Sequence, residues 1–228
     1  MRYTTALLLV ILAAGVALGI SSQGHQVVQR VYLGADTTGS YLENDPYGLA
    51  VTNSASATSY YWVDAWDDLR IRLETAGPSA ATPAYSLFID NTRAYKFSTG
   101  EYVTFAAQLP HTWKEGSTIE FHAHWSPEDA NSGNVTFELQ YTCQSISGGA
   151  FPSTTTVPKT DAVGGVALAH QMTSIADITM TGKTVSSILM CRFGRIAAGD
   201  TYGSEVYVHE VDFHFKRDSN GSRSDDMK

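Results

Sequence analysis

Short segments in which apolar and polar side chains alternate constrain the fold of this chain more than any other feature. In residues 118–125 every second residue is apolar: Ile119, Phe121, Ala123 and Trp125. The residues between them are polar: Glu120, His122 and His124. A period of two places the two sets on opposite faces of a β-strand. We therefore expect Trp125 in the core and both histidines on the outer face.

Similar segments recur at short spacing along the chain. The expected strands are residues 27–33, 60–64, 69–74, 85–90, 93–97, 102–108, 118–125, 134–144, 178–180, 185–193 and 205–216. Turn-forming residues separate them, residues 34–58 are rich in such residues, and residues 153–158 read as a polar loop or an exposed edge. No amphipathic helical pattern connects the strands, so the sequence predicts an all-β protein, a jelly-roll-like β-sandwich with a hydrophobic N-terminal segment.

The last expected strand alternates in the same way. One face is predicted to carry Tyr207, His209, Val211, Phe213 and Phe215. The other face is predicted to carry Glu210, Asp212 and His214.

The N-terminus has a pattern of its own. Residues 6–20 contain no charged side chain and follow a short start with one basic residue, Arg2. This arrangement is typical of a secretory signal peptide, and 15 residues are few for a membrane span, which needs about 20. Three interpretations stay open: a signal peptide, a retained anchor or assembly segment, and an ordinary core helix. We expect a leader over residues 1–24, a jelly-roll domain over 25–216 and a polar tail over 217–228.

The charge balance of the chain argues against one class of partner, nucleic acids. The chain has 15 basic and 23 acidic residues and a pI of about 5.2. Nucleic-acid binding requires clustered basic residues, so we predict no nucleic-acid partner.

Two cysteines cannot form a disulfide framework, and Cys143 lies on the apolar face of an expected strand. Both Cys143 and Cys191 are expected to be buried and reduced.

The His122 and His124 pair is the strongest candidate for chemistry. Two histidines at i and i+2 on a strand can both face a metal, and the spacing resembles the first cupin motif. However, Glu128 falls in an expected turn rather than at a strand start, and no second cupin motif follows. We therefore predict no catalytic residues, no cofactor and no metal. The alternative is a cupin-like metalloprotein in which His214 or Glu120 completes the site, which requires the two strands to be neighbours.

Several segments resemble a family of tailed-phage virion proteins. They are residues 66–69 (WDDL), 95–101 (YKFSTGE), 108–116 (QLPHTWKEG), 122–127 (HAHWSP), 133–141 (GNVTFELQY), 186–192 (SSILMCR), 211–215 (VDFHF) and the tail 221–228. Members of this family are described as structural, fibre or head-decoration proteins and usually begin directly with polar sequence. The resemblance implies no catalytic residues, and the additional leader of this chain suggests attachment through it.

These features together predict a non-enzymatic virion structural protein, such as a fibre, spike or head-decoration subunit. Its expected partners are copies of itself, as a homotrimer, and other virion proteins, with membrane contact through residues 6–20. Its expected location is the virion surface, or a secreted or membrane-anchored state through the N-terminal segment. A second alternative is a secreted carbohydrate-binding module that uses surface Tyr and Trp side chains.

Overall fold

The structure, a computed structural model, divides into two compact units. It describes residues 16–23, 26–33, 40–45, 48–53, 58–61, 65–71, 73, 81–218 and 221–225. One unit comprises Met1–Ala65 and Arg217–Asn220, and the other comprises Trp66–Lys216 and Gly221–Lys228. The sequence suggested one domain over residues 25–216. The boundary at residue 65 follows from the pairing, because the first five strands hydrogen-bond in a sheet of their own.

That first sheet is an antiparallel meander of β1 to β5 in chain order. Its strands are β1 (Val16–Gln23), β2 (Gln26–Leu33), β3 (Ser40–Asp45), β4 (Gly48–Asn53) and β5 (Thr58–Tyr61). The expected loop over residues 34–58 therefore contains two strands. Asp45 pairs with Gly48 across a hairpin, so the turn-forming residues connect strands rather than replace them.

The hydrophobic leader lies mostly beyond the described residues. Residues 1–15 fall outside them, and the remainder of the apolar run belongs to β1. In the parts of the chain that are described, no helix is long and apolar enough to cross a membrane. The signal-peptide and anchor interpretations stay predictions.

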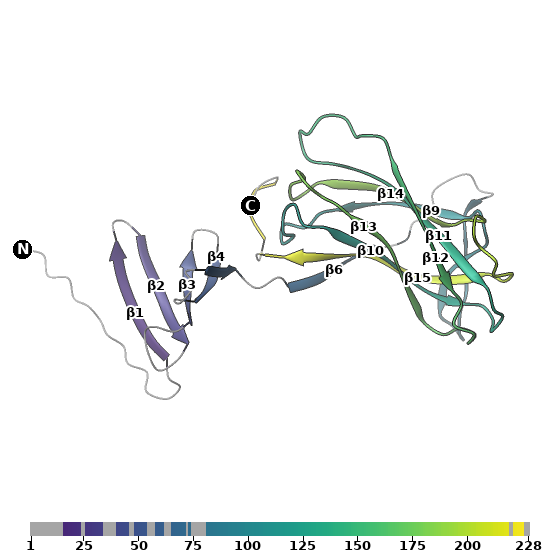
Figure 1. The fold of residues 1–228 in the computed structure, drawn as a ribbon, viewed down its shortest axis with the longest axis horizontal. Coiled ribbons are helices and arrows are strands. Elements are labelled where there is room, and N and C mark those ends of the chain that lie inside the picture. The colour runs from purple at the N-terminus through teal and green to yellow at the C-terminus, as the bar shows by residue number, and fades with distance from the viewer. Residues whose placement is uncertain are drawn as a thin grey trace, which may run out of the picture. The chain divides into compact units, whose positions relative to one another are not determined.

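The second unit is a β-sandwich of two antiparallel sheets, most of whose strands are labelled in Figure 1. One sheet has the order β13-β10-β15-β8-β7, with β6 also paired to β15, and the other has the order β12-β11-β14-β9. The strands of the first sheet are β6 (Ala65–Ile71), β7 (Ala84–Leu87), β8 (Arg93–Phe97), β10 (Ile119–Pro127), β13 (Gln171–Ile178) and β15 (Val206–Arg217). Those of the second are β9 (Tyr102–Gln108), β11 (Asn134–Gln144), β12 (Thr155–Ala162) and β14 (Ile188–Arg195). The predicted fold class, an all-β sandwich, is confirmed.

Aromatic side chains from both sheets form the core between them. Phe121 of β10 lies 5.8 Å from Phe193 of β14, measured between ring centroids. Trp125 is fully buried and lies 5.6 Å from Phe137 of the opposite sheet. Its indole N–H donates to Thr173 Oγ1 at 2.9 Å, so the buried polar atom has a partner. The predicted core position of Trp125 is confirmed.

Both cysteines lie in the same core. Cys143 and Cys191 are free and buried, as predicted. Burial raises the pKa of both thiols, that of Cys191 to about 12, so the uncharged form dominates at neutral pH.

The expected boundaries of β8, β9 and β11 agree with the structure, whereas β13 was largely missed. In β13 the two consecutive residues Ile175 and Ala176 are both buried, which interrupts the alternation. The cause is an irregularity in its pairing with β10, between Phe121 and His122. The polar segment predicted as a loop or an exposed edge begins β12, which is the edge strand of its sheet.

The predicted faces of the last strand are wrong at one end. The pairing of β15 with β10 shifts between His124 and Trp125, at a β-bulge. Val206 and Val208 are therefore the buried core residues at this end of β15. His209 is exposed and lies beside Tyr207 on the outer face, rather than on the face of Val211.

Candidate functional site

Five of the seven histidines of the chain gather on the outer face of the six-stranded sheet. In spatial order they are His214, His122, His124, His170 and His209, here called the histidine row. Two come from β10, two from β15, and one immediately precedes β13. The sequence predicted the outward orientation of the two on β10, and the structure confirms it, since both are only partly buried next to fully buried neighbours.

The pairing of β10 with β15 sets which polar side chains meet. Glu120 lies opposite His214, and His122 lies opposite Asp212. Cross-strand partners in an antiparallel pair have Cβ atoms about 4.5–5.5 Å apart, so their side chains interact directly. The two strands are therefore neighbours in the sheet, as the metalloprotein alternative requires.

Asp212 lies at the centre of the histidine row and is 3% exposed. Its Oδ2 is 3.1 Å from His124 Nε2, and its Oδ1 is 3.5 Å from His122 Nδ1. The longer separation is not a hydrogen bond, and Oδ1 has no hydrogen-bond partner among the described residues. The Asp212 carboxylate nevertheless raises the pKa of His122, and Glu120 and Asp68 act in the same direction against the effect of burial.

Glu120, His122 and His214 form a group whose donor atoms all lie within 4.8 Å of one another. Glu120 Oε2 is 3.6 Å from His122 Nε2 and 3.7 Å from His214 Nδ1. These are three of the four residues of the metalloprotein alternative. The fourth, His124, instead contacts Asp212 and His170, with 2.9 Å between His124 Nδ1 and His170 Nε2.

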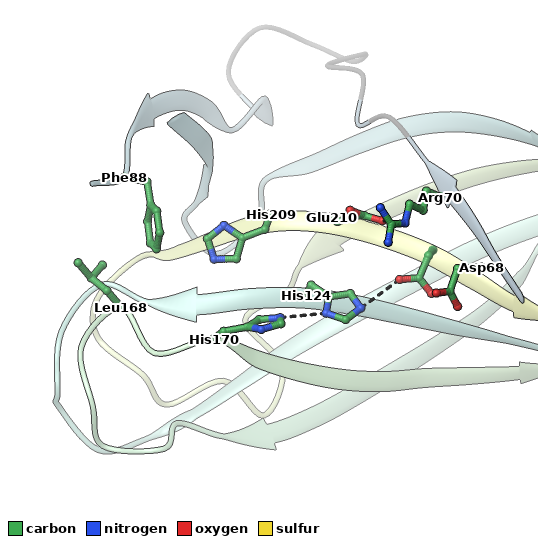
Figure 2. Close-up of a pocket in the computed structure, with 9 residues that line it drawn as sticks. Asp68, Arg70, Phe88, His124, Leu168, His170, His209 and Glu210 are labelled. Atoms are coloured by element: carbon green, nitrogen blue, oxygen red, sulfur yellow. Dashed lines mark hydrogen bonds and ion pairs between the residues drawn. The ribbon is translucent and has the colours of Figure 1, made fainter. Parts of the chain in front are cut away.

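An open cavity of about 530 Å³ adjoins the other end of the row. Figure 2 shows the His124 and His170 rings directed toward each other, with Phe88 and His209 across the cavity. Phe88 packs edge-on to His209, with 4.6 Å between ring centroids. Although His209 is exposed to solvent, partial desolvation by its neighbours lowers its pKa, and the nearby His170 and His124 add to this effect.

Strand β6 adds an exposed aromatic side chain to the same outer face. Trp66 is 43% exposed, and its ring lies 4.6 Å from that of His214. The Lys216 ammonium lies 5.2 Å from the centroid of the Trp66 ring. On the same strand, Arg70 pairs with Glu210 at 3.2 Å.

Sequence reasoning assigned no role to Asp212, His170, His209 or Trp66. For Asp212 a signal existed, because a carboxylate stood between two apolar residues of an expected strand. His170 lies outside every expected strand, so nothing in the local pattern connected it to the site.

No protein-family model matches the chain, and no similar curated protein is found. Among solved structures, a Clostridium thermocellum xylanase 10B fragment with CBM22-1 and GH10 modules, complexed with xylohexaose, is 11% identical with a TM-score of 0.35. The match covers 70% of this chain and 27% of the xylanase chain. TmCBM61 in complex with β-1,4-galactotriose is 13% identical with a TM-score of 0.30, over 67% of this chain and 88% of its own.

The carbohydrate-binding module CBM28, specific for non-crystalline cellulose, is 12% identical with a TM-score of 0.32, over 65% of this chain and 87% of its own. Likenesses at such TM-scores do not support a transfer of function.

Proposed function

We propose that the protein is a non-enzymatic structural component of a phage particle, a fibre, spike or head-decoration subunit. The observation that carries this proposal is the order-preserving resemblance of its sequence motifs to tailed-phage virion proteins. Five of the matching segments fall wholly or partly on β8, β10, β11, β14 and β15, and the others lie on β6, between β9 and β10, and in the tail. Most of the matching segments thus include strands of the sandwich, and the sandwich is the proposed particle module.

The proposal includes copies of the same chain, as a homotrimer, and other virion proteins as partners. The outer sheet faces and the exposed edge strand β12 are the surfaces available for such contacts. An isolated edge strand readily pairs with another chain, and a repeating assembly can use this property. Residues 6–20 would anchor or direct the subunit.

Purified particles test this function. Phage particles from a culture that expresses the protein would be banded on a density gradient and analysed by peptide mass spectrometry. We expect peptides from residues 81–218 to co-purify with the particles, and the N-terminal peptide to reveal the fate of the leader. Protein found free in the supernatant and absent from washed particles would overturn the proposal.

A second candidate, carbohydrate binding, is favoured by Trp66. An exposed aromatic ring that is fixed by neighbours and surrounded by hydrogen-bonding groups suits stacking against a sugar ring. Trp66 contacts His214 and Lys216, with Asp68 on the same strand. Solved structures of weak likeness bind xylohexaose and galactotriose, but the argument rests on Trp66 alone.

Affinity electrophoresis in gels with soluble polysaccharides tests this candidate. Tyr85 is a matched control, because it is 59% exposed on β7 and its ring lies 5.1 Å from that of Tyr95. We expect Trp66→Ala to abolish retardation and Tyr85→Ala to preserve it. Equal retardation of the wild type and Trp66→Ala, or no retardation in any gel, would reject the candidate.

A further inference from the structure

We propose that Glu120, His122 and His214 bind a zinc ion on the outer face of the sandwich. This inference is independent of a role in a phage particle. It concerns a site made from two neighbouring strands, with two ligands from β10 and one from β15.

The first support is the spacing of the donor atoms. Bonds of about 2.0–2.1 Å in a tetrahedral zinc site place neighbouring donor atoms about 3.3–3.4 Å apart. Glu120 Oε2 lies 3.6 Å from His122 Nε2 and 3.7 Å from His214 Nδ1. Both separations are close to this value, and the donor atoms of the two histidines lie within 4.8 Å of each other, so small movements of the partly exposed side chains would bring all three onto one ion.

The second support is a carboxylate near the other ring nitrogen of each histidine. The nitrogen of His122 that faces away from Glu120 is Nδ1, which lies 3.5 Å from Asp212 Oδ1. The corresponding nitrogen of His214 is Nε2, which lies 4.0 Å from Asp68 Oδ1. Histidines that bind metals commonly donate their second ring N–H to a carboxylate, which fixes the tautomer and orients the ring. In both candidate ligands a carboxylate lies near the second ring nitrogen, but at 3.5 and 4.0 Å it is beyond hydrogen-bond distance, so a small movement of the ring or the carboxylate has to complete the contact.

The third support is the unsatisfied carboxylate oxygen of Asp212. The residue is 3% exposed and its Oδ1 has no hydrogen-bond partner among the described residues. An unsatisfied buried carboxylate oxygen is costly. When zinc occupies His122 Nε2, the ring proton is fixed on Nδ1, and a small ring movement lets Nδ1–H donate to Asp212 Oδ1. Metal binding at Nε2 would thus hold His122 in the tautomer that can donate to Asp212 Oδ1.

The donor set selects the class of metal. Two imidazoles and one carboxylate suit zinc and similar divalent ions, whereas calcium and magnesium prefer oxygen ligands alone. Three protein ligands leave one tetrahedral position open. The group is only partly buried, so water or an external ligand can occupy that position.

Calorimetric titration of zinc chloride into the full-length, tag-free protein at neutral pH tests the site. We expect one zinc per chain. Glu120→Gln and His214→Gln each remove a ligand, so they should weaken binding by more than the about 10–100-fold expected for Asp212→Asn. His111→Gln is the matched control, because His111 lies outside the histidine row and bonds to Ser186 Oγ at 2.8 Å. It should bind zinc as the wild type does.

Two further measurements keep the result interpretable. Circular dichroism checks that each variant is folded, and Glu120 and His214 are each about a third exposed, so their replacement spares the core. Cobalt substitution should give the intense visible absorption of a tetrahedral site, lost in His214→Gln. An absence of zinc binding would overturn the proposal, as would binding that survives in folded Glu120→Gln and His214→Gln.

Discussion

Removal of the Arg195 side chain is expected to destabilise the sandwich severely. Arg195 is 2% exposed, and all five of its N–H groups have acceptors. Two donate to the Asp200 carboxylate, each at 2.8 Å. The others donate to backbone carbonyls of Tyr202 at 2.6 Å, Ser204 at 2.7 Å and Phe97 at 3.3 Å. The guanidinium thus connects β8, the end of β14 and the loop before β15.

Arg195→Leu leaves the Asp200 carboxylate buried, with a side chain 3% exposed, and without its counter-ion. Removal of one partner of a buried ion pair typically costs about 3–5 kcal/mol of unfolding free energy. Small domains are stable by only about 5–15 kcal/mol, so about a fifth of the stability or more would disappear. Urea unfolding followed by tryptophan fluorescence measures the loss.

Arg192 provides the matched control on the same strand. Its guanidinium lies 4.2 Å from the centroid of the Tyr102 ring at a partly exposed position, so Arg192→Leu should cost about 0.5–1 kcal/mol. Asp200→Asn should partly rescue Arg195→Leu, because the amide oxygen can still accept the Thr136 N–H while the uncompensated charge disappears. Equal losses for Arg195→Leu and Arg192→Leu, or no rescue by Asp200→Asn, would refute this reasoning.

Three further predictions concern the core and the acid response. Trp125→Ala should cost about 3–5 kcal/mol in a urea titration, because the indole is fully buried; an unchanged midpoint would contradict this. Thiol titration should detect Cys143 and Cys191 only after denaturation, without reductant; a native-state reaction or fewer than two thiols would count against it. Lys96 lowers the pKa of Glu205, so the ionised Glu205 carboxylate stabilises the folded state. This contribution to the unfolding free energy is present above the unfolded-state pKa of about 4.5 and is lost as the pH falls through the lower folded-state pKa. Acid titrations should show a shallower loss for Glu205→Gln, and parallel curves would refute the assignment.

The fold class was predictable because strands with one buried face carry a strong local signal. The boundaries of β11 could be read directly from its alternating side chains, since one face packs against the opposite sheet. The strands β3 and β4 gave no such signal, and their hairpin turn suggested a loop instead. Sequence reasoning thus succeeded where burial imposes alternation and failed where turn-forming residues dominate.

Only part of the candidate zinc site could be predicted from the sequence. Glu120 and His122 share a strand face, so their proximity follows from local geometry. His214 lies near them only because β10 and β15 pair in the sheet. The two strands are far apart in sequence, so no local pattern predicts this pairing. The role of Asp212 depends on the same pairing, since its buried oxygen faces a histidine of another strand.

One irregularity, the β-bulge of the β10–β15 pair, determines how far the histidine row extends. A strict period of two would turn Tyr207 and His209 toward the core together with Val211. The bulge inserts a residue, so Val206 and Val208 fill the core instead, and both ring-bearing residues turn outward to contact Phe88. His209 thereby reaches His170, with 6.2 Å between ring centroids, and the cavity gains one of its walls. The place of His209 in the histidine row thus depends on a single step in register, and tertiary packing decides that step, not local alternation.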